Sequence, residues 1–196
     1  MEDKIYASEL SGHCNELTAW QILAEISEAL IHKGLRSIDP QYIEIGEDGH
    51  FSLAAATVSP NGDGFDAPET TGGLSTESGA VWSLGAILFF IVMGRQVMNG
   101  KGGKGQRDSS KLPYMRSEWP EMSELVQNCL QFNPARRPTL QQVYDRASQQ
   151  YQRCLDEVRK GPKLKIGENS TQKEVAMVDQ DIAFWPETMQ VSQSNL

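Results

Sequence analysis

The chain of 196 residues carries 18 basic and 26 acidic side chains, which gives a formal net charge of −8 and a pI near 4.9. This composition lacks the positive charge that general nucleic-acid binding requires, so we expect no nucleic-acid partner. The three cysteines stand far apart and form no Cys-x-x-Cys pair, which favours free thiols over a disulfide framework or a zinc site. They are Cys14, Cys129 and Cys154.

The first residues, Met1–Lys4, lack the basic and then apolar pattern of a secretory signal. The longest apolar run, residues 80–93, is interrupted by Ser83 and Gly85 and is shorter than the roughly 20 residues of a membrane span. We therefore expect a cytoplasmic protein without an integral membrane segment.

The charges are unevenly distributed along the chain. Residues 1–80 hold 3 basic and 14 acidic side chains, residues 81–160 hold 12 and 7, and residues 161–196 hold 3 and 5. The acidic first part is suited to bind a basic segment of a partner, and an ordinary solvated surface is the alternative.

The first predicted elements are a helix and a hairpin. Apolar residues recur at helical spacing over residues 16–33, and Asn15 is positioned to cap the helix. Two short alternating runs, Tyr42–Ile45 and His50–Leu53, flank the turn sequence Gly46–Gly49 and predict a β-hairpin.

The middle of the chain alternates between irregular and helical patterns. Residues 54–74 are rich in small and turn-forming residues, which predicts a loop, and residues 76–94 are apolar on nearly every side, as in a buried helix. Residues 95–119 predict an exposed basic connection. Apolar spacing over residues 122–130 predicts an amphipathic helix, which Asn133-Pro134 ends.

The last predicted helix begins at the capping-box pattern Thr139–Gln142 and stops at Gly161-Pro162. Beyond it the chain is polar and loses its periodicity. We therefore expect a domain of residues 1–160 and a flexible acidic tail of residues 161–196. The aromatic motif of the tail, around Phe184 and Trp185, either docks on a partner or folds back on its own domain.

Three motifs follow one another along the chain: Ala67-Pro68-Glu69, the helix sequence Val81–Gly85, and Asn128–Thr139 with its Asn-Pro and Arg-Pro-Thr pieces. Their order and approximate spacing are similar to those in the C-terminal lobe of a protein kinase. Over residues 10–155 the chain resembles such a lobe, which implies a mainly α, kinase C-lobe-like domain with a short hairpin. The resemblance also implies a structural ion pair between Glu69 and Arg137.

The positions that match the kinase catalytic residues carry other side chains. Ser37 occupies the position of the catalytic aspartate, Tyr42 that of the metal-binding asparagine, and Ala55 that of the aspartate in the Asp-Phe-Gly motif. A serine is no substitute for a carboxylate base, and a phenol is a poor magnesium ligand. About 15 residues precede the first predicted helix, too few for a nucleotide-binding lobe. We expect no enzyme activity, cofactor or metal.

This combination predicts a pseudokinase-like scaffold or adaptor. Its build is similar to that of non-catalytic domains that consist of a kinase-like C-terminal lobe without an N-terminal lobe. Its expected partner is a protein, with a basic peptide segment as one option, or a second copy of the chain. The candidate partner-binding residues are Arg36, Tyr42 and Phe51, on the surface that an N-terminal lobe covers in a kinase, and Phe184 and Trp185 in the tail.

Two alternatives belong to other classes of protein. In the first alternative, the chain is the non-catalytic half or regulatory subunit of a split or atypical phosphotransferase that another chain completes. In the second, it is a subunit of an assembly in which only packing matters. Metal-dependent nucleotide binding distinguishes the first alternative, and the mass in solution tests the second.

Overall fold

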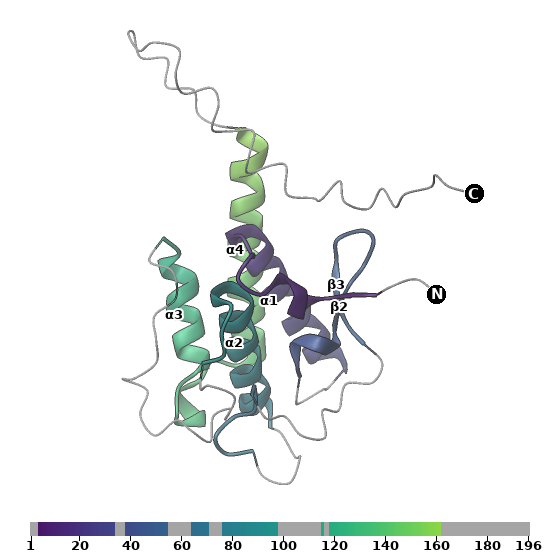
Figure 1. The fold of residues 1–196 in the computed structure, drawn as a ribbon. Coiled ribbons are helices and arrows are strands. Elements are labelled where there is room, and N and C mark those ends of the chain that lie inside the picture. The colour runs from purple at the N-terminus through teal and green to yellow at the C-terminus, as the bar shows by residue number, and fades with distance from the viewer. Residues whose placement is uncertain are drawn as a thin grey trace, which may run out of the picture. The chain divides into compact units, whose positions relative to one another are not determined.

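The computed structural model describes residues 4–33, 38–54, 64–70, 76–97, 115 and 118–161. All of them belong to one compact unit, Met1–Gly161. Within them the fold is mainly helical with a small antiparallel sheet, as predicted (Figure 1). Several predictions fall outside the described residues: those on the tail, on most of the two connections at 54–74 and 95–119, and on Arg36, Ser37, Ala55, Phe184 and Trp185.

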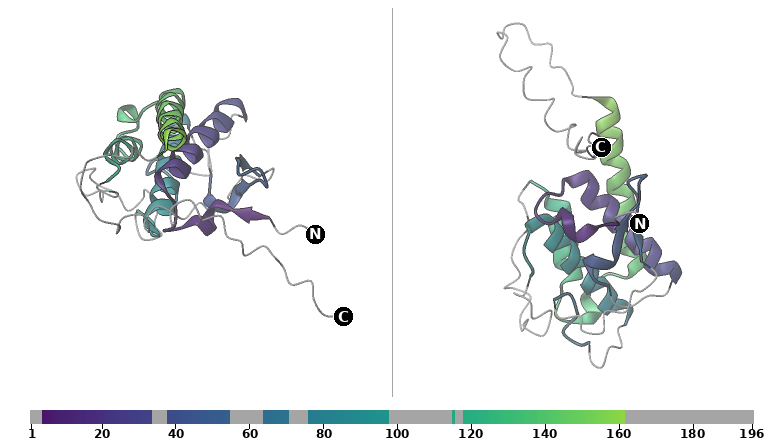
Figure 2. Two further views of the ribbon diagram at one scale, coloured as in Figure 1. Left: turned by 90° about the horizontal axis from the view of Figure 1, so that it is seen from above. Right: turned by 45° about the vertical axis from the view of Figure 1, so that its right-hand side comes forward.

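Helices α1 (Glu16–Lys33) and α4 (Leu140–Lys160) lie along each other (Figures 1 and 2). The bounds of α1 match the prediction, and Asn15 caps the helix because its Oδ1 accepts from the Thr18 amide at 2.8 Å. The predicted capping box of α4 is also confirmed. The Thr139 Oγ1 accepts from the Gln142 amide at 3.1 Å, and the Gln142 Oε1 accepts from the Thr139 amide at 2.9 Å.

Helix α2 (Glu77–Met93) is buried on almost every side and forms the centre of the core. The Thr76 hydroxyl caps its first turn, and Gly94 ends it in the left-handed conformation at φ 69°. Helix α3 (Pro120–Cys129) approaches α2 closely at Gly85, where an added Cβ would lie 2.7 Å from the Cys129 Cβ. None of the helices that the structure describes combines the length and the hydrophobicity of a membrane span.

The sheet contains β1 (Ile5–Tyr6), β2 (Ile43–Ile45) and β3 (Phe51–Leu53), in the order β1-β2-β3 and antiparallel throughout. The pairing of Ile43 with Leu53 and of Ile45 with Phe51 confirms the predicted hairpin. Strand β1 was not predicted, because two residues are too few to show an alternating pattern.

In the part of the chain that the structure describes, short 3₁₀ turns connect these elements: η1 (Ala7–Leu10), η2 (Pro40–Tyr42) and η5 (Pro134–Arg136). The preceding helix, predicted to end at Asn133-Pro134, ends a few residues earlier. Helix α3 stops at Cys129, and Asn133 instead caps η5 by accepting from the Ala135 amide at 3.0 Å. None of the three cysteines forms a disulfide in the described structure, and all three are buried.

Candidate functional site

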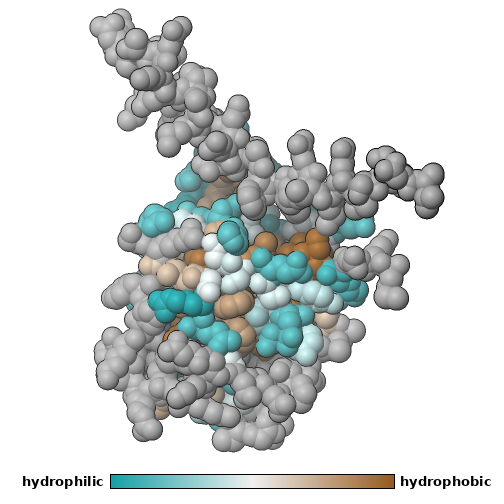
Figure 3. All heavy atoms as spheres, in the orientation of Figure 1, coloured by the Kyte–Doolittle hydropathy of each residue, from teal (hydrophilic) through white to brown (hydrophobic). Residues whose placement is uncertain are grey.

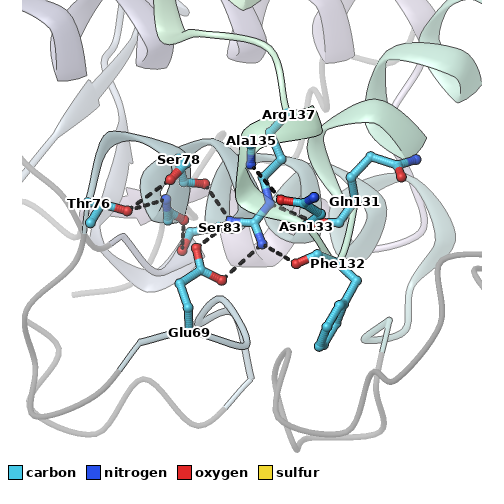
Figure 4. Close-up of polar contacts among 10 residues, drawn as sticks. Glu69, Thr76, Ser78, Ser83, Gln131, Phe132, Asn133, Ala135 and Arg137 are labelled. Carbon is cyan, nitrogen blue, oxygen red and sulfur yellow. Dashed lines mark hydrogen bonds and ion pairs between the residues drawn. The ribbon is translucent and has the colours of Figure 1, made fainter.

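Arg137, between η5 and α4, lies at the centre of a network of polar contacts (Figure 4). Its Nη1 and Nη2 donate to the two carboxylate oxygens of Glu69 at 2.5 and 2.9 Å. Nη1 also donates to the Ser78 carbonyl at 2.9 Å, Nε to the Gln131 carbonyl at 2.8 Å and Nη2 to the Phe132 carbonyl at 3.3 Å. A guanidinium has five N–H donors, and each of these five has an acceptor.

The burial of this ion pair is asymmetric. The Arg137 side chain is 0% exposed, whereas that of Glu69 is 30% exposed. The guanidinium carbon lies 5.0 Å from the centroid of the Trp82 ring, which adds a cation–π contact. A buried cation is strongly destabilising without a counter-ion, so Glu69 stabilises the buried charge of Arg137.

The segment Gly64–Thr70, which carries Glu69, is attached to the helical core at several points. Phe65 and Ala67 are buried, and the Phe65 ring meets the Phe90 ring edge-on with centroids 5.6 Å apart. Together with the contact to Arg137, these side chains hold the segment against α2 and the start of α4.

The first turns of α2 and α4 are also tied to each other. The Glu77 Oε1 accepts from the Leu140 amide at 3.0 Å, which satisfies one of the free amides at the beginning of α4. Since Ser78, next in the chain, accepts from Arg137, the ion pair and both helix starts form one continuous polar network.

The loop before Arg137 presents an aromatic side chain to solvent. Phe132 is 45% exposed, and its ring points away from Arg137 in Figure 4. Its carbonyl and that of Gln131 are both held by the buried guanidinium. The buried guanidinium therefore holds the loop at these two carbonyls, while the Phe132 residue keeps 45% of its surface exposed. Nothing in the sequence pattern singled out Phe132, because its exposure depends on this tertiary network.

The candidate partner surface around the hairpin differs in part from expectation. Tyr42 is half-buried, and its carbonyl accepts from the Ala54 amide at 2.8 Å. Phe51 is only 7% exposed and belongs to the hydrophobic core. This burial corrects the placement of Phe51 on an open surface: alternation along β3 turns Phe51 and Leu53 inward and leaves Ser52 exposed.

A second polar cluster joins the hairpin to α1. The carboxylate of Glu25 contacts His50 Nδ1 at 2.6 Å through Oε1 and accepts from the Phe51 amide at 2.6 Å through Oε2. The hydrogen bond and the charge of Glu25 raise the pKa of His50 above its ordinary value, and Asp48 adds to the effect. Sequence reasoning treated His50 as an ordinary strand residue, because its partner lies 25 positions away.

Within the described part of the chain, no three His, Cys, Asp or Glu side chains gather closely enough to hold a metal ion. No protein-family model matches the chain.

Proposed function

We propose that this protein is a non-catalytic interaction module, a scaffold built like the C-terminal lobe of a kinase. The observation that carries the proposal is that every N–H donor of the Arg137 guanidinium has a hydrogen-bond acceptor. Five donors, one counter-ion and one aromatic face are committed to holding Glu69, α2 and the loop before α4 in place. Such a network supports a rigid framework, which is what a scaffold requires.

The residues at the catalytic positions support the same proposal. Phosphoryl transfer requires a carboxylate near the acceptor hydroxyl and ligands for magnesium, and the sequence has Ser37, Tyr42 and Ala55 at these places. In the described part of this segment the nearby carboxylate of Asp39 is engaged locally, since its Oδ1 caps η2 by accepting from the Gln41 amide at 3.0 Å.

The proposed partner is a protein, either one with a basic segment or a second copy of the chain. Phe132 is the best-supported contact, because an exposed aromatic ring on a loop held by hydrogen bonds loses little conformational entropy on binding. Arg36, Tyr42, Phe184 and Trp185 are further candidates. On the face in Figure 3 apolar and polar residues are interspersed over the described part of the surface.

Partner capture from the native source with the full chain tests the proposal. We expect a stoichiometric protein that is lost with Phe132→Ala but kept with Val158→Ala, a matched control at another exposed apolar side chain, 62% accessible. If the partner is a second copy, the mass in solution exceeds 21.8 kDa for the wild type and falls to it for Phe132→Ala.

Nucleotide binding is the measurement that would contradict the proposal. ATP at a hundredfold its Kd adds about 2.7 kcal/mol of stability, which raises the Tm of a domain of this size by roughly 5–10 °C. We expect no such shift with magnesium or manganese. A metal-dependent shift would instead indicate one half of a phosphotransferase that another chain completes.

A further inference from the structure

The carboxylate of Glu25 on α1 makes two polar contacts to the β2–β3 hairpin, and Lys33 at the end of α1 adds a third to the Leu53 carbonyl at 3.4 Å. Glu25 contacts His50 Nδ1 and the Phe51 amide, each at 2.6 Å, and also accepts from the Gln21 Nε2 at 3.1 Å. Gln21 in turn donates to the Gly49 carbonyl at 3.1 Å. The Glu25 side chain is 19% exposed, so these donors replace most of its contact with water.

One of these donors can change its charge near neutral pH. The amides of Phe51 and Gln21 keep their protons at every accessible pH, whereas a histidine ring titrates in this range. The charged or titratable groups that act on the contact are Asp48 in the turn, whose Oδ1 accepts from the His50 amide at 3.0 Å, and Tyr151 on α4, which senses the charge of Glu25.

We propose that the contact between Glu25 and His50 is a pH-dependent link between β3 and α1, which we call the clasp. With His50 protonated, the contact joins two opposite charges and is a charge-assisted hydrogen bond. With His50 neutral, the ring still donates from Nδ1 in one tautomer, but the attraction between charges is lost. The Phe51 amide donates to the other oxygen of the same carboxylate, so its protection from hydrogen exchange measures how stable the clasp is.

The direction of the pH effect follows from the raised pKa of His50. The folded state binds the proton more tightly than the unfolded state, whose histidine has the ordinary pKa of about 6.5. The stabilising contribution is therefore complete below about pH 6.5 and is lost as the pH rises through the raised pKa of the folded protein.

The clasp also affects how firmly the backbone of Tyr42 is held in place. Tyr42 is held to the hairpin by the Ala54 amide, and Leu53 pairs with Ile43 next to it. Loosening β3 from α1 therefore weakens the support of Tyr42 as the pH rises. This last step rests on the proposed function, whereas the clasp itself does not.

Amide hydrogen exchange on the full chain, measured by NMR between about pH 5.5 and 8, tests the clasp. We expect the protection factor of the Phe51 amide, corrected for the intrinsic rate, to fall by about 1.5- to 5-fold, the range of partly exposed ion pairs. The Thr18 amide is an internal reference, because the neutral Asn15 side chain holds it at 2.8 Å.

Three variants make the outcome specific. In His50→Gln the protection factor of the Phe51 amide is expected to be low and independent of pH, and in Glu25→Gln the pKa of His50, followed by its ring signals, is expected to fall. His32→Gln, at the end of α1, keeps the wild-type profile. A wild-type protection factor that stays constant, or a fall of equal size in His50→Gln, would overturn the clasp.

The clasp and the proposed function fail separately. Capture of the partner that persists at high pH, while the Phe51 amide still loses protection, contradicts only the link to Tyr42. Absence of any partner contradicts the proposed function and leaves the exchange result intact.

Discussion

Arg137 shows how much one side chain contributes when its whole hydrogen-bonding capacity is used. Its planar guanidinium reaches Glu69, Ser78, Gln131 and Phe132 at the same time. A lysine places its charge at one point with three donors, so it cannot reproduce the paired contact to Glu69 together with the three carbonyl contacts.

We therefore predict that Arg137→Lys lowers the free energy of unfolding by about 2–4 kcal/mol, because partly buried carbonyls lose their donors although the charge is kept. Urea unfolding followed by circular dichroism measures the change. The exposed neighbour Arg136 provides the matched control, and Arg136→Lys is expected to change the stability by less than about 0.5 kcal/mol. Equal effects of the two substitutions would contradict the role assigned to the network.

The elements of this fold are joined at their ends by side-chain caps. The first turn of α4 receives the Thr139 hydroxyl, the Gln142 side chain and the Glu77 carboxylate. Since α4 packs along α1, a frayed start of α4 also loosens the interface between the two helices.

We predict that Thr139→Ala lowers the free energy of unfolding by about 1 kcal/mol, the usual value of an N-cap hydroxyl. Thr139 is exposed, so the loss comes from the cap and not from a packing defect. Thr139→Ser keeps the hydroxyl and is expected to stay near the wild type. The prediction fails if the serine and alanine variants unfold at the same urea concentration.

The outer edges of the sheet are also occupied by side chains. On β3 the Phe51 amide donates to Glu25 and the Leu53 carbonyl accepts from Lys33 at 3.4 Å. On β1 the Tyr6 amide donates to Glu9 at 3.2 Å. Edge groups that are satisfied in this way do not favour the addition of a further strand. Partner binding through side chains, as proposed for Phe132, is more consistent with these edges.

At the scale of the whole molecule, the sequence predicted what depends on local pattern. The helix over residues 16–33, the hairpin and the capping box at Thr139 follow from the spacing and type of neighbouring residues. Strand β1 did not follow, because its pairing with β2 joins Ile5 to Ile45 and Tyr6 to Glu44, far apart in the sequence, and leaves no periodic pattern.

The candidate site was predictable to a similar extent. The contact between Glu69 and Arg137 was expected from the motifs, but the carbonyl acceptors around Arg137 were not, since any residue type supplies a carbonyl. The burial of Phe51 and the pairing of Glu25 with His50 depend on how the hairpin packs against α1. A single sequence contains no local signal for that packing.

Two buried cysteines, Cys129 and Cys154, allow the cooperativity of the described domain to be measured. Cys129 is 0% exposed between α2 and α3, and burial raises its pKa to about 12. Cys154 is 8% exposed near the end of α4, and the residues that follow it in the helix are half-buried or exposed. Burial raises the pKa of Cys154 as well.

We predict that a thiol reagent labels Cys154 at least about tenfold faster than Cys129 in native buffer, because unwinding the last turns of α4 exposes Cys154 without opening the core. Cys129 reacts only after global unfolding, which reduces its rate by a factor of about 10³ or more. Peptide mapping by mass spectrometry at increasing labelling times gives both rates in the wild-type chain. In urea above the unfolding transition the two rates converge, which controls for intrinsic reactivity. Equal rates in native buffer would mean that α4 does not open separately and that the described domain unfolds as one unit.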